Sequence, residues 1–181
     1  NIPYGSSALS FYKLKLFNRD IKRAWRPIRD EDYLLGKKNK YDIPKLADET
    51  RIMGVDIAMR AGKTNDNTII TCARLFPSKK GYLTDIVYLE SHNGKNTTLQ
   101  AQRIKQIFEE FRCDILVMDI ANAGIGVYDS LCNITKDEDR GVEYPSYTVM
   151  LSEHIDDKTY KDLRDRTIQL EDARECVFPI Y

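Results

Sequence analysis

The 181-residue sequence lacks several features that assign a chain to a common functional class. It has only two histidines, and its four cysteines form no CxxC pair, so the close ligand spacing of a structural zinc site is missing. No apolar run approaches the roughly 20 residues that cross a bilayer, and no signal peptide is visible. We therefore expect a protein without membrane contact, with reduced cysteines in a cytosolic compartment.

An excess of one charge sign is also missing. The 28 Lys and Arg balance the 28 Asp and Glu, although residues 1–50 carry 11 basic against 7 acidic side chains and residues 129–181 carry 7 against 13. This balance excludes a histone-like basic protein, but it leaves room for a nucleic-acid enzyme with a local basic groove. Apolar residues make up 42% of the chain, which is enough for a packed core.

The pattern of the chain changes near Arg51. Residues 1–50 have no sustained period, and their second half is polar, with a basic cluster and Pro44. We interpret residues 1–50 as an arm or linker from a preceding domain and residues 51–181 as the folded domain. Because the first residue is Asn1 rather than Met, we expect a fragment or an excised domain. A separate observation, the missing third acid described below, leads us to expect truncation at the C-terminal end.

The first part of this domain predicts three antiparallel strands. Residues 51–58, 68–76 and 82–90 are short runs of β-branched, aromatic and other apolar residues. Turn-forming residues separate the runs, first a Gly/Asn/Asp-rich stretch and then Pro77 with Lys79-Lys80-Gly81. The short connections indicate an antiparallel meander.

Helices and strands alternate after the meander. Ile104, Ile107, Phe108 and Phe111 share one helical face, and Thr97 with Gln100 fits a capping box at the start of that helix. The apolar run "DILVMDIA" then predicts a parallel strand buried on both faces. After it we expect a loop "NAGIG", a helix from Val127, a strand at 143–150 and a polar helix at 156–170. This order predicts an α/β fold, a mixed β-sheet with helices on both faces.

The tripeptide Gly62-Lys63-Thr64 resembles the end of a phosphate-binding loop, but two tests argue against that function. Such a loop has the spacing G-x-x-x-x-G-K-[ST], and the first glycine position is Ile57 here. The loop must also lead into a helix, whereas a strand follows. We interpret the tripeptide as turn sequence.

Two aspartates are better candidates for a functional site. Asp56 lies in the apolar run "GVDIA", and Asp119 ends the apolar run "ILVMD". A carboxylate in a buried strand costs several kcal/mol unless it is paired or binds a cation. Each aspartate alone fits a loop cap, but two at strand ends in this order favour a metal site. Oxygen ligands of this kind suit Mg²⁺ or Mn²⁺.

The set of "GVDIA", the Asp66 turn leading into "NTIITCARL", and "ILVMDIANAGIGVYDSL" resembles the ribonuclease H-like superfamily. More narrowly, it is similar to the nuclease domain of the large terminase subunit of tailed bacteriophages. The similarity covers roughly residues 50–150, and its most specific part is the apolar strand with an acid, the xxGxG loop and the helix carrying Asp129.

The resemblance implies an endonuclease that cuts concatemeric double-stranded viral DNA by two-metal hydrolysis, with Asp56 and Asp119 as metal-binding catalytic acids. It implies two Mg²⁺ or Mn²⁺ ions, partners in the small terminase subunit and the portal, and the cytoplasm of a bacterial host. Asp129 and Asp66 are second candidates for the metal site, and Arg60 and Lys63 for DNA contact. The family's third acid has no clear match, so we expect it beyond Tyr181, with the fragment weakly active or inactive alone.

Five other acids were considered for the third ligand, and a solvated helix face explains them better: Glu153, Asp156, Asp157, Asp162 and Asp165. Two other functions remain open. An actin-like or sugar-kinase-like ATPase shares the three-strand opening, but it requires Asp-x-Gly where Asp56 is followed by Ile57 and Ala58. A non-catalytic docking module with the same fold is the other.

Overall fold

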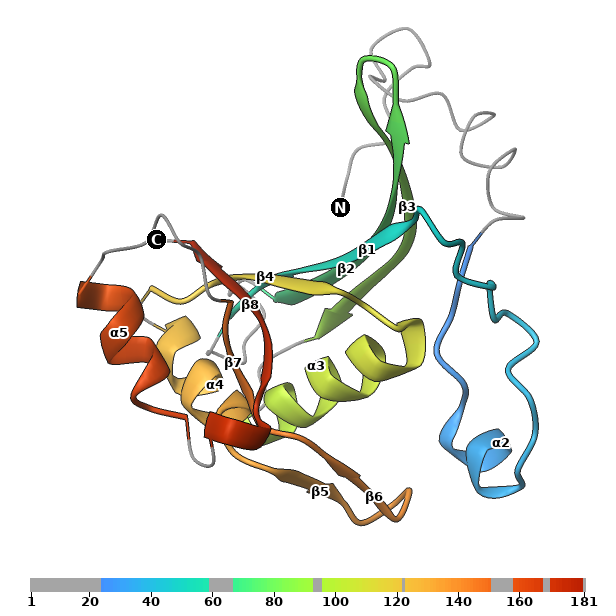
Figure 1. The fold of residues 1–181 in the computed structure, drawn as a ribbon. Coiled ribbons are helices and arrows are strands. Elements are labelled where there is room, and N and C mark those ends of the chain that lie inside the picture. Colours follow the sequence, from blue (N-terminus) through green and yellow to red (C-terminus); the bar gives the residue numbers. More distant parts are fainter. Residues whose placement is uncertain are drawn as a thin grey trace, which may run out of the picture.

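The computed structural model describes residues 24–58, 67–92, 96–121, 123–150, 158–167 and 170–180. Its elements follow one another along the chain as shown in Figure 1. They are α2 (Asp30–Leu34), β1 (Thr50–Asp56), β2 (Thr68–Ser78), β3 (Gly81–His92), α3 (Thr97–Phe111), β4 (Ile115–Asp119), α4 (Ala123–Leu131), β5 (Thr135–Asp137), β6 (Val142–Tyr144), β7 (Tyr147–Val149), α5 (Lys158–Arg164), η2 (Leu170–Asp172) and β8 (Arg174–Ile180).

Six strands form one mixed sheet in the order β3-β2-β1-β4-β8-β7. The first three are antiparallel neighbours, which confirms the predicted meander. After the α3 crossover, β4 pairs parallel with β1, and β8 and β7 add two more parallel pairings. The fold is therefore a mixed α/β fold, as the alternation of elements predicts.

One face of this sheet carries the core. Ile104, Ile107, Phe108 and Phe111 of α3 are fully buried, as their helical spacing predicts. Burial alternates along β4, with Leu116 and Met118 buried and their neighbours half-buried, so the prediction of a strand buried on both faces is wrong. Figure 1 shows α3 and α4 on the same side of the sheet. Helices on both faces were expected, but the described helices α3 and α4 cover only one.

The helix α3 begins differently from its expected capping box. Asn96 is the N-cap, with extended backbone, and its side chain accepts a hydrogen bond from the Leu99 N–H at 2.8 Å. Thr97 is the first helical residue instead. Gln100 turns away from the helix start and contacts β2, so the two residues of the predicted box have separate roles.

The second half of the chain holds more strands than the sequence predicts. The expected strand at 143–150 is interrupted at Pro145, because β6 pairs with β5 in a separate hairpin while β7 joins the main sheet. The last helix, α5, is shorter than predicted and ends at Arg164. The strand β8 was not predicted, although it lies between β4 and β7 in the sheet.

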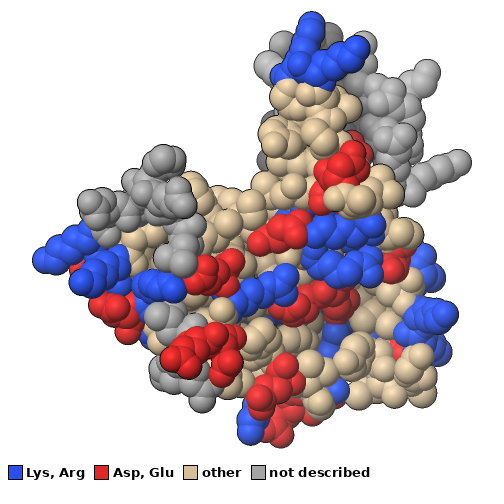
Figure 2. Space-filling model, viewed as in Figure 1, with Lys and Arg blue, Asp and Glu red and all other residues tan. Residues whose placement is uncertain are grey.

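The hairpin of β2 and β3 extends past the rest of the sheet. β1 pairs with β2 only as far as Leu75, whereas β2 continues through Pro77 to Ser78. Pro77 was predicted to stop the strand, but it is tolerated there because none of the described strands pairs with the side of β2 that faces away from β3 at this position. Figure 2 shows basic side chains at the tip of this projecting hairpin, where Lys79 and Lys80 form the predicted turn.

Residues 24–49, which we term the strap, pack against the sheet and α3. Trp25 is fully buried between Tyr88 and Phe111, and its backbone N–H donates to the Val87 carbonyl at 3.1 Å. At the other end of the strap, Glu49 is buried between two arginines. The strap therefore belongs to the packed structure.

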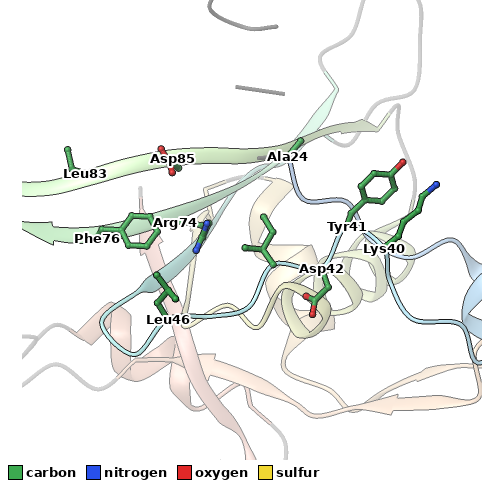
Figure 3. Close-up of a pocket in the computed structure, with 10 residues that line it drawn as sticks. Ala24, Lys40, Tyr41, Asp42, Leu46, Arg74, Phe76, Leu83 and Asp85 are labelled. Carbon is green, nitrogen blue, oxygen red and sulfur yellow. The ribbon is translucent and has the colours of Figure 1, made fainter. Parts of the chain in front are cut away.

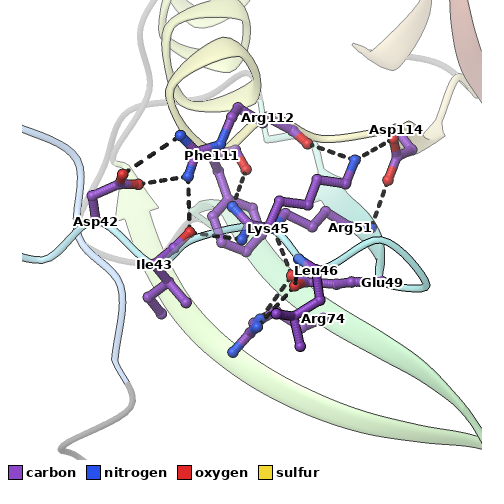
Figure 4. Close-up of polar contacts among 10 residues, drawn as sticks. All are labelled: Asp42, Ile43, Lys45, Leu46, Glu49, Arg51, Arg74, Phe111, Arg112 and Asp114. Carbon is purple, nitrogen blue, oxygen red and sulfur yellow. Dashed lines mark hydrogen bonds and ion pairs between the residues drawn. The ribbon is translucent and has the colours of Figure 1, made fainter.

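Figure 4 shows how the second half of the strap is held. Arg112 donates to the Asp42 carboxylate and to the Ile43 carbonyl, both at 2.8 Å. Lys45 forms an ion pair with Asp114. These contacts join the strap to the start of β4, at the end of the sheet where the parallel strands begin.

All four cysteines are buried free thiols. Among the described residues, no helix combines the length and apolar character required to cross a membrane.

Candidate metal centre

Asp56 and Asp119 occupy equivalent positions on neighbouring strands. Asp56 is the last residue of β1 and Asp119 is the last residue of β4. The residues just before them, Val55 and Met118, are direct partners in the parallel pairing. Because neighbouring strands lie roughly 5 Å apart, the two aspartates occupy adjacent positions at one edge of the sheet. The structure thus brings together the two acids that the sequence singles out.

The two carboxylates also share a face of the sheet. Val55 and Met118 are buried toward α3, and side chains alternate along a strand, so the aspartates project from the opposite face. Asp56 is exposed and Asp119 is half-buried. Neither carboxylate is enclosed in the core, so the expected cost of burial is smaller than the apolar runs around them suggest.

The backbone around Asp119 is tightly fixed. Its carboxylate accepts a hydrogen bond from the Ala121 N–H at 2.8 Å, and the Ile120 N–H donates to the Ile180 carbonyl at 3.1 Å. A Cβ atom on Gly124 would lie 2.0 Å from the Asp119 carbonyl oxygen. Only glycine therefore allows the first turn of α4 to pack directly on Asp119.

This contact corrects the prediction for the stretch "NAGIG". The helix α4 begins at Ala123, so Gly124 and Gly126 lie inside it and not in a loop. The glycines suggested a flexible connection, but their role is close packing. Gly126 faces Thr97 of α3, where an added Cβ would meet the Thr97 methyl carbon at 3.2 Å.

The chain that follows Asp56 is held by the side chain of Thr68. The Thr68 hydroxyl accepts a hydrogen bond from the Ala58 N–H at 2.8 Å. It donates one to the side-chain oxygen of Gln100, also at 2.8 Å. Thr68 is 2% exposed and Gln100 is 4% exposed. This buried contact fixes the direction in which the chain leaves β1, and sequence reasoning missed it.

The donor set fits a divalent cation only in part. Two carboxylates at one edge supply hard oxygen ligands of the kind that Mg²⁺ and Mn²⁺ prefer. However, the described part of the chain contains no group of three His, Cys, Asp or Glu side chains placed to hold a metal ion. Of the acids considered for a third ligand, Asp162 and Asp165 are exposed. The other three lie outside the described residues.

Asp129 does not join the carboxylate pair. It lies roughly 9 Å along α4 from the start of the helix, and it forms an ion pair with Arg166 at 2.7 Å. Asp66, Arg60 and Lys63 lie outside the described residues. The candidate metal centre therefore rests on Asp56 and Asp119.

Comparison with known proteins adds no further assignment. No model of a known protein family matches the chain, and a search of curated proteins finds no match. The geometry of the sheet edge is thus the basis for the functional argument.

Proposed function

We propose that this chain is a metal-dependent endonuclease domain of the terminase type, acting on double-stranded viral DNA. The observation that carries the proposal is the pairing of Val55 with Met118, which sets Asp56 and Asp119 side by side at one sheet edge. Two acids at matching positions of adjacent parallel strands are an arrangement suited to binding a divalent cation.

The order of strands supports the ribonuclease H-like part of this proposal. A three-strand antiparallel meander is followed, after a helix, by a strand parallel to the first one. The acids lie where β1 and β4 end, and in α/β sheets ligands bind outside the carboxyl ends of parallel strands. The position of the carboxylates thus agrees with a catalytic site.

Each residue has a stated role in the proposal. Asp56 and Asp119 would hold Mg²⁺ or Mn²⁺ through their carboxylates, while Gly124 and Thr68 fix the backbone beside them. Two bound cations would supply an activated water and stabilisation of the leaving oxygen in phosphodiester hydrolysis. A third carboxylate is still required, and Glu153, Asp156 and Asp157 are the acids of this chain that remain to be tested.

The first test is the binding of Mn²⁺ measured by isothermal titration calorimetry. We expect binding to the unsubstituted protein and its loss in Asp56→Asn and in Asp119→Asn, because each change removes an anionic ligand. Asp129→Asn is the matched control, since its carboxylate pairs with Arg166 and its loss leaves the sheet edge unchanged.

A plasmid cleavage assay with Mn²⁺ then tests the activity. Cleavage that both sheet-edge variants abolish would support the endonuclease. Binding of Mn²⁺ that is equal in all four proteins would reject the metal centre and favour a docking module. Tight binding of ATP in the same calorimeter would reject the nuclease in favour of an ATPase.

A further inference from the structure

A concave surface lies on the strap, away from the carboxylates. Two stretches, 26–29 and 37–41, form its sides, and it encloses about 470 Å³. We term this surface the strap groove. It is lined by Arg26, Pro27, Ile28, Arg29, Asp32, Lys37, Lys38, Asn39, Lys40 and Tyr41.

The strap groove is strongly basic, with five Lys and Arg residues and only one acid in its lining. That acid, Asp32, is already neutralised, because Arg29 and Lys37 both contact its carboxylate at 2.8 Å. The ion pairs of the described residues include none that involves Arg26, Lys38 or Lys40. These three cations therefore remain available to an external anion.

Two other acids of the strap, Asp30 and Asp42, form ion pairs with arginines outside the strap. Asp30 pairs with Arg140 and Asp42 pairs with Arg112. Figure 3 shows Lys40 and Tyr41 projecting together to one side of the strap, while the Asp42 carboxylate points the other way. The strap thus separates its charges, with its free cations on the groove side.

The two sides of the groove are fixed to one another. The Asn39 side-chain amide donates to the Arg26 carbonyl at 2.7 Å and accepts from the Tyr41 N–H at 2.9 Å. The cations of Arg26 and Lys40 lie 5.3 Å and 5.0 Å from the centroid of the Tyr41 ring. These contacts place Arg26 and Lys40, two of the three free cations, beside one aromatic ring.

The strap groove is separate from the candidate metal centre. The strap is anchored at the start of β4 through Arg112 and Asp114, whereas Asp119 lies at the end of that strand. β1 runs between the same two ends of the sheet, and a strand of its length spans roughly 20 Å. A ligand in the groove therefore does not occupy the carboxylate edge.

We propose that the strap groove binds the phosphate backbone of nucleic acid, independently of the metal centre. Arg26 and Lys40 beside the Tyr41 ring, together with Lys38 in the same lining, suit a chain of successive phosphates, which Lys and Arg neutralise regardless of sequence. A flat anionic lipid surface fits less well, because α2 beside the groove opens with Asp30, Glu31 and Asp32. A flat surface would also reach Asp30 and Glu31, which are not among the residues that line the groove.

The test uses fluorescence anisotropy with a labelled DNA duplex in EDTA, so that no metal contributes. The groove variant combines Arg26→Gln, Lys38→Gln and Lys40→Gln. The control variant removes three exposed charges elsewhere, by Lys136→Gln, Lys158→Gln and Lys161→Gln. We expect the groove variant to bind at least about tenfold more weakly, and its slope of log affinity against log salt to flatten by about 2 to 3. The control variant should stay close to the unsubstituted protein.

Two results would overturn the inference. One is an equal loss of DNA binding in both triple variants, which would show that DNA responds to the net charge of the protein and not to the groove. The other is unchanged DNA binding with loss of binding to phosphatidylglycerol vesicles, which would assign the groove to a membrane. Circular dichroism checks that both variants are folded. Asp56→Asn should bind DNA in EDTA as the unsubstituted protein does. The test of the groove therefore gives an answer even if the proposed metal centre is rejected.

Discussion

Gly124 shows how one hydrogen atom in place of a side chain shapes the candidate site. The first turn of α4 lies so close to Asp119 that any Cβ atom on Gly124 would overlap the carbonyl oxygen. The backbone would have to move apart, and Asp119 would move with it. Gly126 differs, because an added Cβ would meet only a methyl group at 3.2 Å.

We therefore predict different effects for two glycine substitutions in the same helix. Gly124→Ala should lower the free energy of unfolding by about 1 to 3 kcal/mol through overpacking, and it should weaken Mn²⁺ binding. Gly126→Ala should be nearly neutral, since better helix propensity offsets the tighter contact by up to about 1 kcal/mol. Urea unfolding and calorimetry measure both. Equal effects would show that the contact with Asp119 does not matter.

Single residues were predictable from sequence only where the signal is local. The apolar runs around Asp56 and Asp119 marked both residues as unusual, and the parallel pairing places them together. The contact between Thr68 and Gln100 joins residues 32 positions apart, and nothing in either local pattern indicates it. The Gly124 contact was not predicted for a different reason, because a glycine-rich stretch usually indicates a loop.

At the scale of elements, the strap is the segment whose role changes most. Its polar sequence suggested a linker, yet Glu49 is buried where the strap enters β1. Arg74 donates two hydrogen bonds to the Glu49 carboxylate, at 2.7 and 2.8 Å, and Arg51 donates one at 2.6 Å. Although burial opposes ionisation, these bonds lower the pKa of Glu49 from 4.5 to about 2.

This shift makes the anchor of the strap dependent on pH. A folded-state pKa below the unfolded value adds stability that is present above about pH 4.5 and is lost as the pH falls toward about 2. Such a shift corresponds to on the order of 3 kcal/mol. We predict that Glu49→Gln lowers the free energy of unfolding at pH 7 by about this amount and flattens its fall in acid. Urea unfolding at several pH values measures both.

The exposed acid Asp162 on α5 provides the control for that experiment. Asp162→Asn should leave both the stability at pH 7 and its acid dependence close to those of the unsubstituted protein. An acid profile in Glu49→Gln as steep as in the unsubstituted protein would show that other carboxylates, and not Glu49, govern the loss of stability.

Long elements were predictable and short ones were not. β2, β3 and α3 carry enough periodic residues to be recognised, and their predicted ranges are close to the observed ones. β5, β6 and β7 have three residues each, too few to show a period. β8 contains Pro179, and a proline argues against a central strand. The structure nevertheless places β8 between β4 and β7.

At the scale of the whole molecule, long-range contacts decide what local patterns leave open. The sequence predicts an antiparallel meander and a parallel crossover, but not which edge of the sheet the later strands join. That edge depends on β8 pairing with β4. The strap is also joined to α3 through Arg140, which contacts both Asp30 of the strap and Glu110 of α3. Strap, sheet and α3 therefore share one set of buried contacts.

The buried tryptophan allows a test of whether the strap and the sheet unfold together. Trp25 is the only tryptophan in the chain, it belongs to the strap, and it packs on Phe111 of α3 with ring centroids 4.9 Å apart. We predict that Trp25 fluorescence and far-UV circular dichroism give the same urea midpoint, because the strap leaves the core only when the sheet unfolds. Trp25→Ala should lower the free energy of unfolding by about 3 to 5 kcal/mol. A red shift of the emission at a lower urea concentration than the loss of dichroism would instead show a strap that detaches from a folded sheet.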